Sequence, residues 1–510
     1  MNPNKTYFFQ SFIIVVLSIV SLIVFKQFLP KKIFPESASS TKNVVIDSLL
    51  LEAVEKESEQ AIEVDTLANS EITFEEENGV KFPAEAYEQY KGYQHLVAFY
   101  EKLLQLETTH QGNVRIAYFG DSMTDGDMIV KDFRSSLQQQ FGGEGVGFVN
   151  ITSESAGSRS TLTHQFSSNW KTLSYLNVKN PSSPFGINGH VFFVKHDTVN
   201  PVWVKYKAGN LKNLTSLNNA TLFYGKSGNK AGEVNFIIGK DTISKKLNPL
   251  GLLNTLPVSS SVLKSFQANF VNADSIPFYG FNFDDGRGVH VDNFSNRGNS
   301  GLPISTFRTN VMKAFNEKLG YDLVVLHYGT NVLNYGSLNY SWYEKRMAKV
   351  VAHLKECFPG VAILVVSTAD KSTKYDLEMK TDSAVVPLTQ AQKRYSIKSE
   401  AAFVNLYTLM GGDGSMVKWV EEVPAMGNKD YTHFNLRGSK KISDYIYNQV
   451  IKGYNQYKKL KGVQEINAEP KTEQTPSVPV PDTPVAPTMP KKAPVRKDSL
   501  LKKTDSTNAQ

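Results

Sequence analysis

Short apolar runs alternate with amphipathic stretches in the second half of the chain, and a further apolar run lies near residue 114. Apolar runs of strand length, separated by stretches with helical spacing, indicate a parallel sheet whose two faces are both covered by helices. We therefore expect an α/β domain. The expected strands are 114–119, 322–328, 361–366 and 403–406, and the expected helices are 343–357, 388–402 and 436–454.

Between the first strand and the later ones, the hydrophobic pattern changes to a period of two. Short alternating segments are separated there by Gly, Asn, Asp and Ser turns, which is typical of an antiparallel all-β unit. We predict an inserted β-sandwich over 149–290, flanked by the two parts of the α/β domain, 83–148 and 291–460. The expected strands of the insert are 190–194, 202–206, 220–224, 234–238, 266–270 and 278–283.

The N-terminal region differs from both domains. Residues 8–25 are almost wholly apolar, and Lys26 follows, so residues 1–29 are predicted to be a transmembrane anchor or a signal sequence. No Ala-x-Ala-like cleavage site follows, which favours an uncleaved anchor. Residues 30–82 are predicted to be a polar, acidic linker. From about residue 84 to residue 104, apolar and aromatic residues recur at helical spacing, which predicts a helix before the first strand. Residues 461–510 form a tail rich in Pro and Lys, for which we expect disorder.

Composition restricts the chemistry more than it identifies it. The 510 residues carry a formal net charge of +7. Acidic residues concentrate at 47–77, and basic residues concentrate in the C-terminal tail. Because no basic cluster lies within a predicted folded motif, we do not expect the protein to bind nucleic acid. Cys357 is the only cysteine, which excludes an intramolecular disulfide and a cysteine-based metal cluster. Asp125 and Asp127 are better placed to cap or turn the chain than to bind metal, and we predict no metal and no cofactor.

Two short motifs supply the residues of a nucleophilic triad. Gly120-Asp121-Ser122 follows the first strand, and Asp430-Tyr431-Thr432-His433 lies near the end of the folded region. A serine hydroxyl needs a base to take its proton, and a histidine base needs a carboxylate to hold its tautomer. Ser122, His433 and Asp430 are predicted to fill these three roles.

Residues between these motifs offer donors for an oxyanion. Asn296 to Gly301 forms a glycine-bearing loop, and Gly329-Thr330-Asn331 follows a strand. A glycine amide and an asparagine side chain suit the negative charge that develops in acyl transfer. The loop glycines and the Asn331 side chain are therefore candidate donors for an oxyanion.

Ser122, Gly301, Asn331 and His433, in this order and in these motifs, resemble the four blocks of the SGNH (GDSL-type) hydrolases. This resemblance implies a three-layer, flavodoxin-like α/β/α fold and a serine esterase mechanism. It also implies an oxyanion hole made by the amides of Ser122 and Gly301 and the side chain of Asn331. The stretch from Ser122 through Arg134 to Phe148, together with the inserted module, also resembles the bacterial peptidoglycan O-acetylesterases.

The second resemblance implies a substrate and a location. The expected substrate is an O-acetylated cell-wall polysaccharide, most of all peptidoglycan, and the insert is expected to be a carbohydrate-binding-like module in which Trp203 and tyrosines are candidates for sugar stacking. The bulk of the chain is then expected outside the cytoplasm, attached to the membrane by its N-terminal helix. Two alternatives remain open: an O-acetyltransferase that uses the same triad, and a non-catalytic, wall-anchored carbohydrate-binding protein.

Overall fold

The computed structural model describes residues 47–57, 70–195, 201–333, 335 and 338–462. The predicted anchor at 1–29 and all but the first two residues of the predicted tail lie outside the described residues. Within the described part of the chain, no helix combines the length and the apolar character needed to cross a bilayer.

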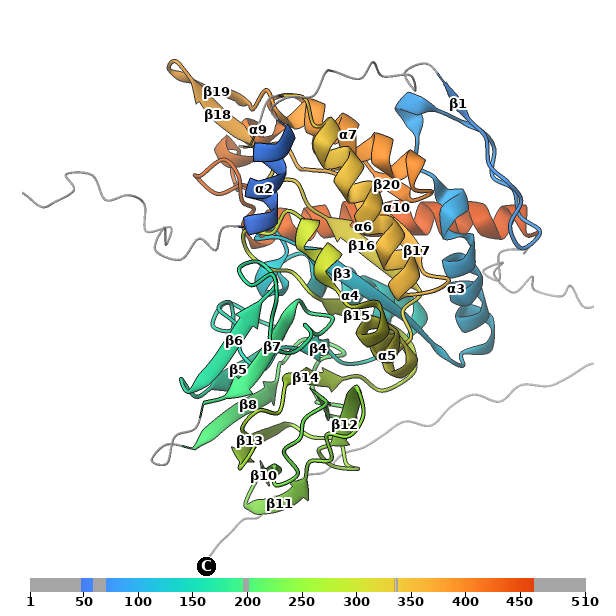
Figure 1. Cartoon of the computed structure of the whole chain (residues 1–510). Helices are drawn as coiled ribbons and strands as arrows, with labels where there is room; N and C mark the ends of the chain where they lie inside the picture. The colour runs from blue at the N-terminus through green and yellow to red at the C-terminus, as the bar shows by residue number, and fades with distance from the viewer. Residues whose placement is uncertain (1–46, 58–69, 196–200, 334, 336–337, 463–510) are drawn as a thin grey trace, which may run out of the picture. The chain divides into compact units, whose positions relative to one another are not determined.

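A five-stranded parallel sheet forms the centre of the α/β domain (Figure 1). Its strand order is β15-β3-β16-β17-β20, so the first strand along the chain lies in the interior of the sheet and later strands extend it on both sides. The bounds are β3 Asn113–Gly120, β15 Gly288–Asn293, β16 Leu323–His327, β17 Ala362–Val366 and β20 Ala402–Val404. The predicted parallel sheet is confirmed, and β15 is an edge strand that the pattern did not reveal.

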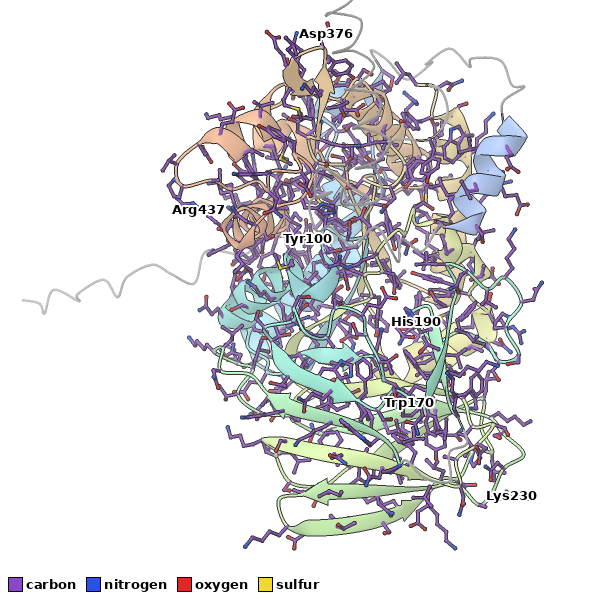
Figure 2. All side chains as sticks on the ribbon, turned by 90° about the vertical axis from the view of Figure 1, so that its left-hand side faces the viewer. Tyr100, Trp170, His190, Lys230, Asp376 and Arg437 are labelled. Atoms are coloured by element: carbon purple, nitrogen blue, oxygen red, sulfur yellow. The ribbon has the colours of Figure 1, made fainter. Side chains whose placement is uncertain are left out.

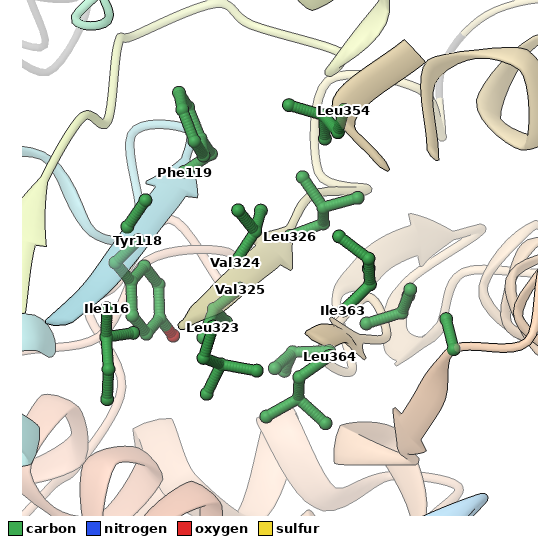
Figure 3. Packing of buried hydrophobic residues seen from close by; sticks show 14 of the residues in the cluster. Ile116, Tyr118, Phe119, Leu323, Val324, Val325, Leu326, Leu354, Ile363 and Leu364 are labelled. Atoms are coloured by element: carbon green, nitrogen blue, oxygen red, sulfur yellow. The ribbon is translucent and has the colours of Figure 1, made fainter. Parts of the chain in front are cut away.

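Nearly every side chain of these strands is buried, as a sheet covered on both faces requires. Figure 3 shows Ile116 and Phe119 of β3 on opposite sides of the sheet, paired in register with Leu323 and Leu326 of β16. All four belong to one buried cluster. Because the side chains on both faces of the strands are apolar, neither face can be left in contact with water. The sequence pattern of short unbroken apolar runs follows from this burial.

Two groups of helices cover the sheet and complete a three-layer α/β/α arrangement. Helices α3, α4 and α10 contact one another, and α5, α6 and α7 form the other contacting series. Most predicted helices appear near their expected bounds, whereas α5 was not expected. The bounds are α3 Val97–Thr109, α4 Val130–Phe141, α5 Thr309–Leu319, α6 Ser341–Cys357, α7 Val385–Lys398 and α10 Leu436–Leu460.

The insert, here called the inserted β module (residues 147–283), contains two antiparallel sheets. One has the order β11-β10-β13-β8-β5, and the other has the order β12-β9-β14-β7-β6, with β4 paired to β14. Apolar side chains from both sheets meet in one core, which includes Trp170, Tyr206 and Phe281. The bounds are β4 Gly147–Val149, β5 Leu162–Phe166, β6 Trp170–Ser174, β7 His190–Val194, β8 Val202–Ala208, β9 Thr221–Gly225, β10 Glu233–Ile238, β11 Asp241–Lys246, β12 Leu253–Pro257, β13 Ser265–Val271 and β14 Phe278–Phe283.

The six strands expected in the insert are all present, and its other five strands were not expected. β11 is exposed along almost its whole length, so it lacks the alternation that identifies a half-buried strand. Trp203 lies partly exposed on β8, while Tyr206 and Tyr224 are buried in the module core. Of these three candidates for sugar stacking, only Trp203 presents an accessible ring.

The region before the first strand differs from its prediction in two places. Within the expected polar linker, Ser48–Glu57 forms helix α2, which buries Leu50 and Ala53 against the α/β domain. The helix expected over 84–104 is broken into the 3-10 turns Tyr87–Gln89 and Tyr93–Leu96 before α3 begins. Gly92 adopts a φ of +61° at this break, and Glu85 accepts its backbone N–H, so helical hydrogen bonding stops there.

Candidate active site

The nucleophile turn begins where β3 ends. A Cβ placed on Gly120 would come within 2.1 Å of the Thr124 hydroxyl, so only glycine allows the chain to fold back this tightly. The Asp121 carboxylate accepts the backbone N–H of Met123 at 2.9 Å, which holds the turn closed. Ser122 therefore leaves the sheet at its carboxyl edge, with its side chain partly exposed.

The Asp-x-x-His motif forms a turn immediately before α10. Asn435 caps this helix by accepting the N–H groups of Arg437 and Gly438. Tyr431 takes a φ of +52°, a left-handed conformation that is uncommon for a tyrosine, and its carbonyl accepts the N–H of Ser372 at 2.9 Å. The turn that carries His433 is thus held by hydrogen bonds at both ends.

The three predicted catalytic residues come together. The hydroxyl of Ser122 lies 2.9 Å from Nε2 of His433, and Nδ1 of His433 lies 2.8 Å from Oδ2 of Asp430. A carboxylate can only accept at this distance, so Nδ1 carries the proton and Nε2 is left to accept the proton of Ser122. This is the arrangement in which serine, base and orienting carboxylate can act in sequence.

The Asp430 carboxylate is held in its ionised form. Partial burial by itself raises the pKa of Asp430, but hydrogen bonds from the side chain and the backbone N–H of His433 outweigh it and lower the pKa to about 2. Asp430 is therefore negative across the whole range in which a histidine base works. It can orient the neutral imidazole and stabilise the imidazolium that forms when Ser122 loses its proton.

The loop at 296–301 is organised around Asn299, whose side chain and backbone both bind neighbours. Its Nδ2 donates to the hydroxyls of Tyr175 and Tyr328, at 2.8 and 3.3 Å, and its Oδ1 accepts the N–H of Gly301 at 2.9 Å. Its carbonyl accepts Nδ2 of Asn331 at 3.1 Å. The structure thus places Asn331 directly beside the predicted oxyanion loop.

The backbone of Gly301 has close neighbours. Its N–H is bound to Asn299, and its Cα packs so closely that a Cβ would lie 2.9 Å from the Tyr328 ring. Gly298, three residues earlier, is partly exposed with a φ of +78°, and its N–H has no hydrogen-bond partner within the described residues. The Gly301 amide is thus bound and buried in this structure, and its assignment as an oxyanion donor stays a prediction.

Two further contacts fasten the loop to its surroundings. The N–H of Asn296 donates to the carbonyl of Gly120 at 3.0 Å, which joins the loop to the nucleophile turn. On the other side, Oδ2 of Asp47 accepts the N–H of Ser300 at 3.0 Å and also its hydroxyl. The same Asp47 carboxylate binds the first N–H groups of α2, at Leu49 and Leu50. A segment expected to be linker therefore supports the site.

Several residues with a role in the site were not found from the sequence. Asp121 is fully buried beside the nucleophile, and this burial raises its pKa to about 6, although the charge of His433 acts in the opposite direction. Asp47 and Tyr175 act on a loop more than 120 positions away from either of them. No local pattern identifies such contacts, because the partners meet only after the chain has folded.

Asp127 does not cap the helix that follows. Its carboxylate instead pairs with the buried guanidinium of Arg134, at 2.8 and 3.1 Å, and α4 begins without a side-chain cap. Within the described residues, no group of three or more His, Cys, Asp or Glu side chains is arranged to hold a metal ion. The site as described consists of side-chain and backbone groups of the chain itself.

Comparison with known proteins shows the fold. No protein-family model matches the sequence, and no curated protein matches it. A solved structure of a peptidoglycan O-acetylesterase is similar with a TM-score of 0.58 and 20% identity, covering 70% of this chain and 96% of that one. Two carbohydrate esterases of family 2 are more distant. That of Corynascus thermopiles (Myceliophthora fergusii) is 12% identical, with a TM-score of 0.26, and that of Cellvibrio japonicus is 9% identical, with a TM-score of 0.24; each covers 57% of this chain and 99% of its own.

Proposed function

We propose that this chain, which has the fold of the SGNH hydrolases, is a serine esterase that removes O-acetyl groups from a cell-wall polysaccharide, with peptidoglycan as the first candidate. The observation that carries the proposal is the hydrogen-bonded series Ser122, His433 and Asp430, with distances of 2.9 and 2.8 Å. The fold shared with a peptidoglycan O-acetylesterase supports the choice of substrate class.

The geometry supports a two-step acyl transfer. The Ser122 oxygen attacks the acetyl carbonyl while Nε2 of His433 takes its proton, and the same proton then passes to the sugar oxygen as the ester bond breaks. This leaves an acetyl group on Ser122 and a free sugar hydroxyl. Water attacks the acetyl-serine with His433 again as base, and acetate leaves as Ser122 recovers its proton.

The negative charge on the carbonyl oxygen needs donors in both steps. We assign the backbone N–H of Ser122, the side chain of Asn331 and the N–H of Gly298. Asn331 now donates to the carbonyl of Asn299, and its second Nδ2 hydrogen is available to a ligand. Gly298 replaces Gly301 in the assignment, because the Gly301 amide already binds Asn299.

The remaining parts of the chain suit an enzyme that acts on a polymer outside the cytoplasm. Asp430 and His433 are partly exposed, with side-chain exposures of 48% and 38%, so a bulky glycan chain can approach them. We propose that residues 1–29 anchor the chain to a membrane and that the inserted β module is a carbohydrate-binding β-sandwich. On this proposal, the anchor keeps the enzyme beside the wall while the module holds the glycan.

Acetate release tests the proposal. The full-length protein is incubated with O-acetylated peptidoglycan and with acetylated xylan, and Ser122→Ala is compared with Ser158→Ala, a control that leaves the triad untouched. We expect release from peptidoglycan that Ser122→Ala abolishes and Ser158→Ala preserves. Equal release by the Ser122→Ala protein would refute the serine mechanism.

Two other results would redirect the proposal. If an activated acetyl ester acylates Ser122 but no glycan loses acetate, the enzyme transfers the acetyl group to a sugar hydroxyl and is an O-acetyltransferase. If Ser122 is not acylated and the protein still binds the glycan, the chain is a non-catalytic carbohydrate-binding protein. Mass spectrometry of the intact protein distinguishes these cases through the added acetyl group.

A further inference from the structure

A polar cleft of about 250 Å³ lies where the inserted β module meets the nucleophile turn. One wall comes from the segment after β4 and from β6 and β7, and the other comes from Asp125 and from the start of the 296–301 loop. Figure 2 shows His190 on the side of the module that faces the α/β domain, with Trp170 farther away. The cleft is thus formed jointly by the two parts of the chain.

We propose that this cleft is a binding subsite for one neutral, acetamido-bearing sugar ring, next to the sugar whose ester is cleaved. This inference rests on the proposed function, since it names the neighbour of the acetylated sugar. It adds a specificity-determining site formed by Asn150, Thr152, Thr172 and His190, none of which belongs to the triad or the oxyanion hole.

The cleft is fastened to the catalytic turn. Asp125 follows Ser122 by three residues, so their Cα atoms lie at most about 11 Å apart. Its carboxylate accepts the hydroxyl of Ser155 at 2.7 Å through one oxygen and Nε of Arg297 at 2.7 Å through the other. Asp125 therefore connects the module wall to the loop wall. The cleft therefore borders the turn that carries Ser122.

The module wall presents a hydrogen-bond acceptor and a donor together. Nδ1 of His190 donates to the carbonyl of Asn188 at 2.9 Å, and burial lowers the pKa of His190, so the ring is neutral and its Nε2 is an acceptor. Nδ2 of Asn188 donates to Oδ1 of Asn150 at 2.8 Å, which leaves Nδ2 of Asn150 as a donor. Neither this Nδ2 nor Nε2 of His190 has a partner among the residues that the structure describes. A secondary amide, as in an acetamido group, offers the matching N–H and C=O.

The charges of the cleft favour a neutral ligand. Asp125 and Arg297 form an ion pair, and the remaining charged residue among the described lining residues is the exposed, acidic Glu154. An anionic sugar such as a uronate would meet no surplus positive charge here and would be repelled by Glu154. A hydroxyl- and amide-bearing ring meets no such cost.

The size and the composition of the lining restrict the ligand further. A volume of about 250 Å³ lies below the range of about 300–1,000 Å³ typical of sites for drug-sized ligands, so the cleft suits a single ring. Among its described lining residues, Leu176 is the one aliphatic side chain, and Trp, Tyr and Phe are absent. Recognition therefore depends on hydrogen bonds, including the facing hydroxyls of Thr152 and Thr172, which lie 3.1 Å apart.

The test fills the cleft without touching the triad. Thr172→Trp places a large ring in the cleft, and Lys171→Trp places the same ring on the adjacent position of β6, which does not line it. Both full-length proteins are assayed with O-acetylated peptidoglycan and with the small ester 4-nitrophenyl acetate. For Thr172→Trp we expect kcat/KM to fall about tenfold or more with peptidoglycan and to stay unchanged with the small ester, since a tenfold loss corresponds to about 1.4 kcal/mol. Lys171→Trp should match the wild type with both.

Competition identifies the class of sugar. N,N′-Diacetylchitobiose, a neutral acetamido disaccharide, should inhibit wild-type turnover of peptidoglycan and lose this effect in Thr172→Trp, whereas digalacturonate should not inhibit. Thr152→Trp, from the facing segment, is the second variant if Thr172→Trp loses its folded circular dichroism spectrum. Equal losses with both substrates, no loss with either, or equal inhibition by digalacturonate would each overturn the proposed subsite.

A binding measurement distinguishes an incorrect esterase proposal from an incorrect subsite proposal. If the wild type hydrolyses no substrate, calorimetry with the Ser122→Ala protein still measures binding of N,N′-diacetylchitobiose. Binding that Thr172→Trp weakens about tenfold, but Lys171→Trp does not, supports the subsite in the absence of turnover. No binding by the Ser122→Ala protein would overturn it.

Discussion

Asp121 shows how a single buried carboxyl can influence both the stability and the geometry of a catalytic turn. It lies between the last residue of β3 and the nucleophile, and its exposed fraction is 1%. Hydrogen bonding to Met123 keeps the turn closed, while burial raises the pKa to about 6. Ionisation of the Asp121 carboxyl, one residue before Ser122, is therefore energetically unfavourable near neutral pH relative to an exposed carboxyl.

Asp121→Asn should raise stability more at pH 7.5 than at pH 5. Because the folded-state pKa of about 6 lies above the ordinary aspartate value of 3.8, the folded protein binds the proton more tightly, and stability falls as pH rises between these two values. Asparagine keeps an acceptor for Met123 and does not ionise. The gain at pH 7.5 relative to pH 5 should be roughly 1 kcal/mol, since one pKa unit corresponds to about 1.36 kcal/mol.

Urea denaturation at the two pH values measures this difference. Ser122→Ala is the control, because it leaves Asp121 in place and should keep the pH dependence of the wild type. A gain in stability that is the same at both pH values would show that Asp121 is not protonated in the folded protein near pH 5.

Helix α2 shows that a short element can support a site without contributing to the chemistry. Its N-terminal Asp47 binds the first turn of the helix with one carboxylate oxygen and binds Ser300 with the other. Leu50 and Ala53 bury the same helix against the α/β domain. The position of the 296–301 loop therefore depends on a segment that lies before the first strand.

Asp47→Asn should reduce kcat about tenfold with a small acetyl ester, which corresponds to about 1.4 kcal/mol of lost transition-state stabilisation. An asparagine oxygen can still cap α2, but its amide cannot accept the N–H of Ser300, so the loop loses a fixed contact. Steady-state kinetics and a thermal melt separate this effect from unfolding. Glu52→Ala, which removes an ion pair between α2 and Lys179 and leaves Asp47 in place, is the control. An equal loss in that variant would contradict a specific role for the contact to Ser300.

The two parts of the folded chain are joined by a buried polar network around Arg115 of β3. Its guanidinium binds Asp292 of β15 at 2.8 Å and Asp284, just beyond β14 of the module, at 2.7 Å. Asp292 in turn accepts the N–H of Phe148 at 2.8 Å and the hydroxyl of Tyr321 at 2.6 Å. The module is thus attached to the central sheet by groups that cannot be hydrated once they are buried.

Arg115→Leu should lower the free energy of unfolding by about 3–5 kcal/mol, because it leaves two buried carboxylates without their partner. Guanidinium denaturation followed by tryptophan fluorescence measures the loss. Lys440→Ala removes an exposed ion pair with Asp444 on α10 and should cost less than about 1 kcal/mol. Comparable losses in the two variants would show that the network does not hold the parts together.

The sheet, most of the helices and the triad could be predicted because their signals are local. A run such as Leu323–Leu326 is apolar throughout because both faces of β16 are covered, and this is visible in the sequence without knowledge of its neighbours. Ser122 and His433 each lie in a short motif at the end of an element. The order of these motifs along the chain, with a strand before the nucleophile and a helix after the histidine, already restricted the chemistry to a serine nucleophile.

The folded structure was needed wherever a property depends on partners distant in sequence. The sequence does not distinguish the amide of Gly298 from that of Gly301. Only the structure shows that the Gly301 N–H donates a hydrogen bond to Asn299. The sequence predicts that Asp47 belongs to an acidic linker, and only the structure shows that its carboxylate accepts the N–H of Ser300. The polar cleft is lined by His190 and Asp125, 65 positions apart, and exists only because the module folds against the nucleophile turn. Hydrogen bonds are directional and short-ranged, so the pattern of one segment does not reveal which distant group will satisfy it.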